Sequence, residues 1–175
     1  MSAVLRSRIG GLMIAGIVWF LDQAIKNWVR FDLDLPTVKS VEILPFFRLT
    51  WMQNFGISLG LFTAGSVEGR FLLVALTSAI AMFVLVWIFR ERKMGDIAAL
   101  GLVLGGALGN IQDRALLGYV VDYADLHFGE WRPFLIFNLA DAAITIGVLI
   151  ILARSLLSRE KPEASADEPA PGELN

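Results

Sequence analysis

The fold is decided by the stretch Asp96-Ile-Ala-Ala-Leu-Gly-Leu-Val-Leu-Gly-Gly-Ala-Leu-Gly-Asn-Ile-Gln-Asp-Arg114, which is almost entirely apolar before it ends in polar and charged side chains. Its length approaches the roughly 20 residues that a helix needs to cross about 30 Å of hydrocarbon. Its glycines would let a neighbouring helix approach closely, as small residues do where helices pack inside a membrane. The stretch therefore predicts a membrane-spanning helix with a close helical neighbour.

Three further apolar stretches, near 9–29, 70–90 and 134–154, have similar lengths. Apolar residues make up 56% of the 175 residues, above the roughly 45–50% that is usual in soluble proteins. Together with 96–114, these stretches predict an all-α membrane protein with four transmembrane helices. Its membrane-embedded domain is expected to occupy 1–157.

The remaining composition excludes several classes of chemistry. The chain has no cysteine and a single histidine, which excludes disulfides, a thiolate metal site and a cysteine nucleophile. We therefore expect neither a metal nor a cofactor. The net charge of -2 is too close to neutral to indicate a nucleic-acid partner.

Basic residues flank the four apolar stretches unequally. Clusters at 6–8, 90–93 and 154–161 all fall on one side of the predicted membrane, and the positive-inside rule makes that side cytoplasmic. On the other side basic and acidic residues are mixed. Both termini are therefore predicted to be cytoplasmic. The segment 158–175 is predicted to be a disordered tail, because it is rich in Pro, Glu, Ala and Ser and lacks apolar periodicity.

The connection over 31–68 is predicted to lie on the opposite, periplasmic side. Within it Phe47, Leu49 and Trp51 occupy every second position, a period of two that is typical of a strand. This pattern predicts a small β-rich subdomain at the membrane surface. The glycines and apolar residues of 54–60 suit a segment that lies in the interface without crossing it.

Polar side chains interrupt three of the predicted helices at similar depths. At 1.5 Å per residue, Asp22 lies roughly 20 Å from the cytoplasmic start of its helix, and Asp141 lies roughly 10 Å from the outer start of the last helix. In a membrane about 30 Å thick these depths coincide. Asn110 and Asp113 reach a similar level. Because ionisable residues inside a bilayer are costly, the cluster they form is a functional hypothesis.

Within each helix these polar residues are three or four positions apart and share one face. Asp22 and Lys26 are expected to form a structural ion pair, because opposite charges one turn apart satisfy each other. Asp113 and Arg114 are either a cluster at a helix end or, for Arg114 above all, a contact to substrate. Asp141 has no basic residue within a turn of its helix, so its carboxylate needs a proton or a partner from elsewhere.

Five motifs along the chain resemble those of the lipoprotein signal peptidases, also called signal peptidase II. In chain order they are Asp22-Gln-Ala-Ile-Lys26, Asn54-Phe-Gly-Ile-Ser58, Gly105-Gly-Ala-Leu-Gly-Asn-Ile-Gln-Asp-Arg114, Val120-Val-Asp-Tyr123 and Phe137-Asn-Leu-Ala-Asp141. They extend from the first predicted helix to the last. The sequence departs from the common family pattern at two positions, Ile136 and Gln53. Neither of them touches an expected catalytic group.

The resemblance implies a membrane aspartic endopeptidase of a bacterial inner membrane, with Asp122 and Asp141 as its catalytic dyad and its active site facing the periplasm. It also implies residues that hold the substrate or the dyad, namely Asn54, Gly56, Asn110, Arg114 and Asn138, and residues that support the site, namely Asp22, Lys26 and Asp113. The implied substrate is a prolipoprotein whose cysteine carries a diacylglyceryl group and which is cut just before that cysteine. Membrane lipid is a further expected partner, and the implied inhibitor is globomycin.

Two other classes of protein compete with a peptidase. A small transporter or proton-relay subunit would also carry carboxylates on several helices. Such a protein needs polar residues across the whole membrane, whereas the inner halves of the predicted helices, such as 12–18 and 84–88, are apolar. A purely structural membrane protein gives no account of Asp122 and Asp141. The peptidase is therefore the favoured hypothesis.

Overall fold

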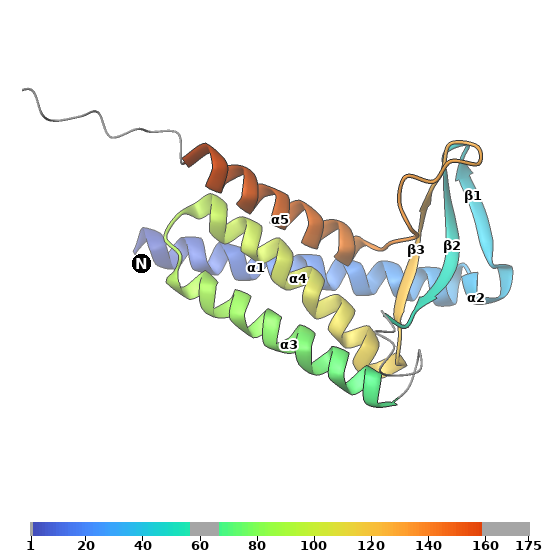
Figure 1. Cartoon of the computed structure of the whole chain (residues 1–175), viewed down its shortest axis with the longest axis horizontal. Helices are drawn as coiled ribbons and strands as arrows, with labels where there is room; N and C mark the ends of the chain where they lie inside the picture. The colour runs from blue at the N-terminus through green and yellow to red at the C-terminus, as the bar shows by residue number, and fades with distance from the viewer. Residues whose placement is uncertain (1, 57–66, 159–175) are drawn as a thin grey trace, which may run out of the picture.

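The computed structural model describes residues 2–56 and 67–158, and four long helices dominate it (Figure 1). These helices are α1 (Ala3–Asn27), α3 (Val67–Arg90), α4 (Met94–Leu117) and α5 (Leu139–Ser158). Each is long and apolar enough to cross a membrane, which confirms the prediction of four membrane helices. The predicted disordered tail, apart from Ser158, and positions 57–60 of the predicted interfacial segment lie outside the described residues.

Helix α4 is the central helix of the bundle, because it contacts α1, α3 and α5. In its candidate span 56% of the apolar window is buried, against 11–17% in the other three. A Cβ atom on Gly105 would lie 2.5 Å from the carbonyl oxygen of Ala15 in α1, and one on Gly106 would clash with the carbonyl oxygen of Ala140 in α5. The close approach predicted from the glycines is therefore confirmed, and it occurs on two faces of one helix.

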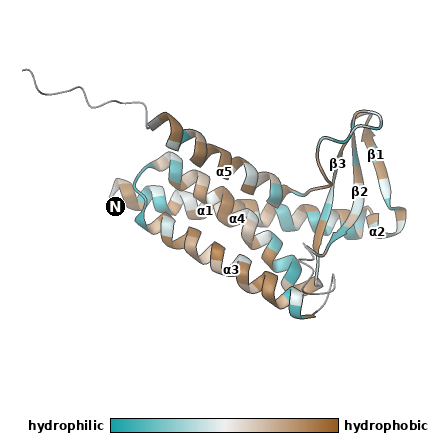
Figure 2. Ribbon diagram, in the orientation of Figure 1, coloured by the Kyte–Doolittle hydropathy of each residue, from teal (hydrophilic) through white to brown (hydrophobic). Residues whose placement is uncertain are grey.

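The outward faces of the helices are also apolar. Figure 2 shows hydrophobic residues along most of their length. Large side chains that remain exposed include Phe20, Phe71, Phe83, Leu149 and Leu152. A soluble monomer rarely exposes so large an apolar surface, so these faces suit contact with lipid.

A three-stranded antiparallel sheet lies at the end of the bundle opposite the N-terminus (Figure 1). Its strands, in spatial order, are β1 (Ser40–Leu44), β2 (Phe47–Asn54) and β3 (Val120–Leu126). The strand predicted from the alternation of Phe47, Leu49 and Trp51 is confirmed as β2, and the predicted small sheet is present. Strand β3 was not predicted; it follows Gly118, which ends α4 in the left-handed conformation with φ of 88°.

Two short elements connect α1 to the sheet, the π-helix η1 (Trp28–Asp32) and the helix α2 (Leu35–Val38). Val29 of η1 and Leu35 of α2 are fully buried against side chains of the sheet, among them Leu49 and Val121. This second apolar cluster fixes the sheet to the extension of α1. The sheet is therefore held in place over the ends of the helices.

The last helix begins later than the sequence predicted. The predicted span was 134–154, but α5 starts at Leu139, because the preceding chain pairs with β3. Phe137 exchanges backbone hydrogen bonds of 3.1 and 2.8 Å with Ala124. Asp141 therefore lies in the first turn of α5, and the depth that was calculated for it from position 134 is wrong.

Candidate active site

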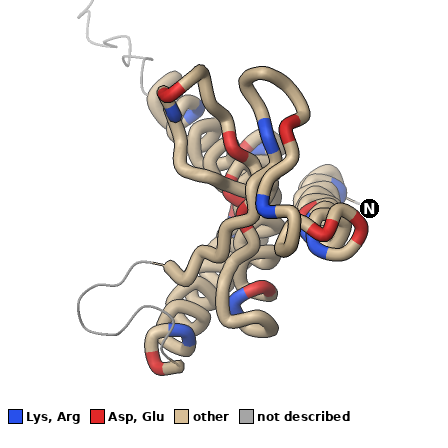
Figure 3. The backbone as a smooth tube through the Cα atoms, turned by 90° about the vertical axis from the view of Figure 1, so that its right-hand side faces the viewer, with Lys and Arg blue, Asp and Glu red and all other residues tan. Residues whose placement is uncertain are grey.

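Buried polar side chains gather where α1, α4 and α5 meet β3. Six of them are at most 7% exposed, and these are Asp22, Lys26, Asn110, Asp113, Asp122 and Asn138. Figure 3 looks onto this end of the molecule, where acidic and basic residues occur together. Burial of charge is costly without partners, so the hydrogen bonds of each group decide what the cluster can do.

Lys26 is the cation at the centre of the cluster. Its Nζ atom lies 2.7 Å from Asp22 and 2.9 Å from Asp113, and it donates a hydrogen bond of 3.2 Å to Asn110. These three partners match the three donors of an ammonium group. The ion pair expected between Asp22 and Lys26 is present, but a second carboxylate shares the cation.

The two carboxylates around Lys26 also bind backbone groups of neighbouring elements. Asp22 accepts a hydrogen bond of 3.0 Å from the backbone of Ala140 in α5, and Asp113 accepts one of 3.0 Å from the backbone of Val121 in β3. A Cβ atom on Gly109 would clash with the Asp22 carboxylate, so α4 needs a glycine there. The cluster thus connects α1, α4, α5 and β3.

Asn138 and Asp141 form the start of α5. The side-chain oxygen of Asn138 accepts a hydrogen bond of 2.9 Å from the backbone of Asp141, whose carboxylate accepts one of 3.3 Å from the backbone of Asn138. This reciprocal pattern resembles a capping box. The other oxygen of Asp141 accepts a hydrogen bond of 2.8 Å from the amide of Asn110. The partner that Asp141 was expected to need is therefore an amide on α4.

Asp122 lies on β3 and is 1% exposed. The amide of Asn138 donates a hydrogen bond of 2.6 Å to one of its oxygens, and the amide of Asn54 donates one of 2.9 Å to the other. Burial, with a smaller contribution from the charge of Asp141, raises the pKa of Asp122 to about 6, although the two amides partly oppose this shift. Asp122 is thus a carboxyl group that binds a proton more readily than an ordinary aspartate.

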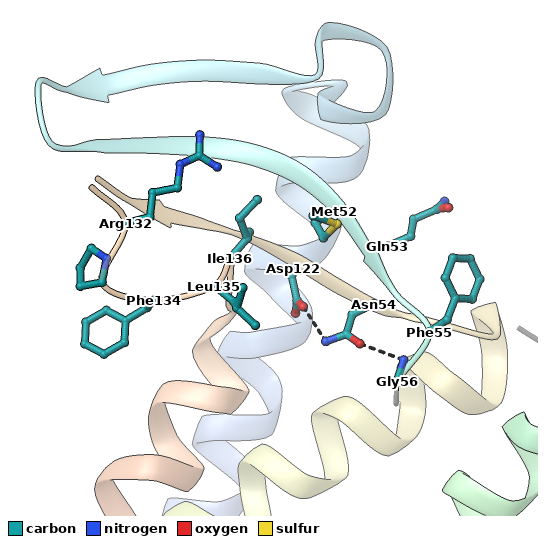
Figure 4. A pocket seen from close by; sticks show the side chains of 11 residues that line it. Met52, Gln53, Asn54, Phe55, Gly56, Asp122, Arg132, Phe134, Leu135 and Ile136 are labelled. Carbon is teal, nitrogen blue, oxygen red and sulfur yellow. Dashed lines mark hydrogen bonds between the residues drawn. The ribbon is translucent and has the colours of Figure 1, made fainter. Parts of the chain in front are cut away.

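Asn54 is itself held by the backbone that follows it. Its side-chain oxygen accepts a hydrogen bond of 2.9 Å from the backbone N–H of Gly56 (Figure 4). Gly56 has φ of 86°, a conformation that favours glycine. The sequence-predicted pair Asn54 and Gly56 therefore acts as one unit that aims an amide at Asp122.

The carboxylates Asp122 and Asp141 line two different cavities. Asp122 and Asn54 line one of about 630 Å³ (Figure 4), and Asp141 lines an apolar one of about 310 Å³ beside α5. Phe134 and Leu135 line both cavities. An elongated molecule could therefore contact both carboxylates from two adjoining spaces.

Arg114 is half-buried near these carboxylates. The charges of Asp141, Asp122 and Asp113 all act on it, yet its Nε atom is buried and has no hydrogen-bond partner among the described residues. It forms no ion pair with the neighbouring Asp113 within the described part of the chain, so the interpretation as a closed helix-end cluster is not favoured. Its Nε is thus a buried donor whose hydrogen bond is not supplied by the described residues.

Two glutamines of the cluster were missed by the sequence analysis. The amide of Gln23 donates to Asp22 at 3.2 Å and to Asp113 at 3.1 Å, and its oxygen accepts a hydrogen bond of 2.8 Å from Gln112. The oxygen of Gln112 in turn accepts one of 2.8 Å from the indole of Trp19. Gln23 and Gln112 adjoin Asp22 and Asp113 in the sequence, a proximity that could have identified them. Over 2–56 and 67–158, no group of three acidic or histidine side chains is arranged to hold a metal ion.

A family model and the most similar relatives point to one family, and solved structures share the fold. A family model described as signal peptidase (SPase) II matches residues 14–157. A lipoprotein signal peptidase of Rhizorhabdus wittichii is 52% identical over 157 residues, which are 90% of this chain and 91% of the relative. One of Sphingopyxis alaskensis is 49% identical over 160 residues, 91% of this chain and 92% of the relative. Two solved bacterial membrane enzyme structures, each 28% identical, superpose with TM-scores of 0.71 and 0.73 over 90% and 87% of this chain and 94% of each of theirs.

Proposed function

This chain belongs to the signal peptidase II family, whose members remove signal peptides from prolipoproteins, and we propose that it does so as an aspartic endopeptidase with Asp122 and Asp141 as its catalytic dyad. The observation that carries this proposal is the position of Asn138. Its amide donates to Asp122 at 2.6 Å, while its backbone N–H and its side-chain oxygen are both bonded to Asp141. One residue thus orients two carboxyl groups that come from different elements.

The dyad works with one proton between its two carboxyl groups. Two carboxylates close together in a poorly solvated site do not both ionise, and in aspartic proteases generally two aspartates share one proton for this reason. The raised pKa of Asp122, about 6 because of burial, favours Asp122 as the group that holds the proton. Both carboxyl groups accept hydrogen bonds on both oxygens, so the assignment rests on the burial of Asp122, and Asp141 is proposed as the base.

Hydrolysis follows from this distribution of the proton. Asp141 removes a proton from a water molecule whose oxygen attacks the scissile carbonyl carbon, while Asp122 gives its proton to the carbonyl oxygen. The intermediate collapses when Asp141 gives its proton to the leaving nitrogen and Asp122 regains one from a hydroxyl of the intermediate. The C–N bond breaks, and both carboxyl groups return to their initial state.

The other polar residues are proposed to hold the peptide or the dyad. Asn110 and Asn54 each donate to one of the two carboxylates. Arg114 has a buried Nε donor without a partner in the described chain, which suits a carbonyl oxygen of the substrate. The site is proposed to be supported by the ion-pair cluster that joins α1, α4 and α5, namely Lys26, Asp22 and Asp113.

The lipid of the substrate is proposed to lie in the apolar cavity beside α5. Its lining includes Phe137, Ala142 and Ile146 together with Asp141, so acyl chains there would bring the modified cysteine to the dyad. The proposed substrate is therefore a diacylglyceryl-modified prolipoprotein, cut just before that cysteine. Globomycin is the proposed inhibitor of the same site.

We propose that the sheet end faces the periplasm across a bacterial inner membrane. The start of α1, the turn between α3 and α4, and the end of α5 lie together at the opposite end of the bundle (Figure 1), and these are the segments that carry the basic clusters. Reporter fusions at Leu35 and Gly129 should report the periplasm, and one at Met94 the cytoplasm. The reverse pattern would overturn this orientation.

The rival hypothesis of a transporter or proton-relay subunit is not supported by the interior of the bundle. Beyond the polar cluster, α1, α3 and α4 pack through an apolar core that includes Ala15, Val84, Ile88, Ile97 and Leu100. In the described helices the polar network thus ends within one half of the bundle. An ion pathway would need partners along the other half.

The experiment is a cleavage assay with purified protein in detergent. The wild-type protein should cut a diacylglyceryl-modified precursor, should cut the unmodified precursor far more slowly, and should be inhibited by globomycin. Asp122→Asn and Asp141→Asn should each lower the rate by at least about a hundredfold, the order of magnitude of lost acid–base catalysis. Normal cleavage by either variant would show that the dyad is wrong.

A further inference from the structure

The larger cavity contains one feature that the proposed mechanism does not use. Arg132 lines it together with Asp122 and Asn54, while most of the other lining side chains are apolar, including Met52 and Phe134. Arg132 is the only lysine or arginine among the described residues that line this cavity. In Figure 4 it lies near strand β2, farther from the helices than Asp122.

The charge of Arg132 is only loosely paired. Its Nη2 atom is 3.6 Å from an oxygen of Asp125, and its side chain is 50% exposed. The same oxygen already accepts a hydrogen bond of 2.8 Å from Arg48 and one of 3.3 Å from Thr50. Asp125 is the only acid within 4.0 Å of either arginine in the described parts of the chain. Two cations therefore share one carboxylate, and Arg132 is the more loosely paired of the two.

Asp125 stays ionised in this arrangement. Its burial alone would raise its pKa, but the hydrogen bond from Arg48 and the charges of both arginines outweigh that effect and hold the pKa below its usual range. Asp125 thus fixes Arg48 firmly and leaves donors of Arg132 free. Arg132 also lines the cavity that contains Asp122.

We infer that Arg132 selects precursors by the charge of their mature segment, by forming an ion pair with an acidic side chain a few residues after the cleaved bond. This inference rests on the proposed function, because it takes Asp122 as the point of cleavage. The signal peptide precedes the bond and is apolar, so it lies toward the helices. The mature segment follows the bond and leaves past the sheet, on the side of Arg132.

The position of the acidic residue follows from the strand geometry. Asp122 and Asp125 are three residues apart on β3, about 10 Å at the rise of a strand, and their side chains leave opposite faces of it. Arg132 nevertheless lines the same cavity as Asp122. Because the Arg132 guanidinium lies within 3.6 Å of Asp125, an extended substrate is expected to meet it about three residues beyond the bond at Asp122. Arg132 is therefore expected to form its ion pair with an acidic side chain at the second to fourth residue of the mature segment.

The test compares modified precursors that differ only in carrying Asp, Asn or Lys at these positions. Wild-type protein should cut the Asp precursor about two- to fivefold faster than the Lys precursor by kcat/KM, the range expected for a partly exposed ion pair, and added salt should reduce the difference. Arg132→Gln should remove the preference and Arg132→Glu should reverse it. Lys39→Gln, which removes one exposed charge from the same end without touching the cavity, should leave it.

Three results would overturn the inference. These are equal cleavage of all three precursors by the wild-type protein, an unchanged order with Arg132→Glu, and an equal loss of preference with Lys39→Gln. If Arg132→Glu does not accumulate, Arg132→Gln decides by itself through loss or retention of the preference. Wild-type protein that cuts no precursor would contradict the proposed function, whereas equal rates on all three contradict only the role of Arg132.

Discussion

The two halves of α4 are held against their neighbours by different kinds of contact. From Ile97 to Leu104 the helix packs through apolar side chains and close glycine contacts. From Gly109 to Asp113 it belongs to a buried network of charges and amides. An apolar side chain that loses one methyl group keeps most of its contacts, whereas each member of a buried polar network needs its partners. Removing a charged partner from the polar half should therefore cost more than trimming an apolar side chain in the other half.

The largest effect on stability is expected when the central cation is removed. Lys26→Met leaves the buried carboxylates of Asp22 and Asp113 without their shared partner, which should cost about 3–5 kcal/mol. Ile97→Val is the matched control at the apolar half, where Ile97 is fully buried, and it should cost about 0.5–1.5 kcal/mol. Unfolding in detergent micelles measures both. Equal stability of the two variants would contradict the contrast between the halves.

A smaller loss is expected when only the geometry of the network is disturbed. In Gly109→Ala the new methyl group would meet the Asp22 carboxylate, which lies too close to leave room for a Cβ atom; the expected cost is about 1–3 kcal/mol. Gly16→Ala in α1 is the control, since a Cβ atom there has no heavy atom within 4 Å. It should change the free energy of unfolding by less than about 1 kcal/mol. The same unfolding measurement would refute the argument if both alanines behaved alike.

The smallest expected effect is a shift of the pH profile. Since the pKa of Asp122 is about 6 because of burial, the free enzyme loses this proton as the pH rises through about 6, and kcat/KM should fall there. The amide of Asn54 stabilises the ionised form, so its removal raises the pKa of Asp122 further. Asn54→Ala should therefore move the alkaline limb to higher pH.

Gln53→Ala provides the control for that profile. Gln53 lines the same cavity but no hydrogen bond from its side chain to Asp122 is present in the described residues. The alkaline limb of the kcat/KM profile of Gln53→Ala should therefore stay at the wild-type pH. A limb that moved to lower pH in Asn54→Ala, or moved equally in both variants, would exclude Asn54 as a partner of the ionised carboxylate.

The sequence predicted the architecture better than it predicted the connections between elements. Long apolar stretches identify membrane helices without any knowledge of their neighbours, and the alternation at 47–52 identified β2. Strand β3 follows α4 after a single glycine turn and is buried along almost its whole length. Its pairing with β2 is a long-range contact, which no local sequence pattern predicts.

In the candidate site, too, the sequence predicted contacts within one helix but not contacts between elements. Spacing on one helix predicted the contact of Asp22 with Lys26, because both residues belong to one face. It could not predict that Asp113 shares this cation or that Asn110 reaches Asp141, since those contacts depend on how helices pack. The start of α5 was misplaced because the apolar residues before Asn138 resemble a continuing helix, although the pattern Asn138-Leu-Ala-Asp141 contains the capping signal.

The shared catalytic role of Asp122 and Asp141 is tested most directly by comparing single and double variants of this proposed dyad. Asn keeps the shape of Asp but is neither a base nor a carboxylic acid. Asp122→Asn, Asp141→Asn and the double variant should therefore insert and accumulate while cutting a diacylglyceryl-modified precursor equally poorly, because residues that act as a unit are non-additive. The measurement is the cleavage rate per amount of membrane protein. Multiplied losses in the double variant, or near-normal turnover by either single variant, would contradict a shared catalytic role for Asp122 and Asp141.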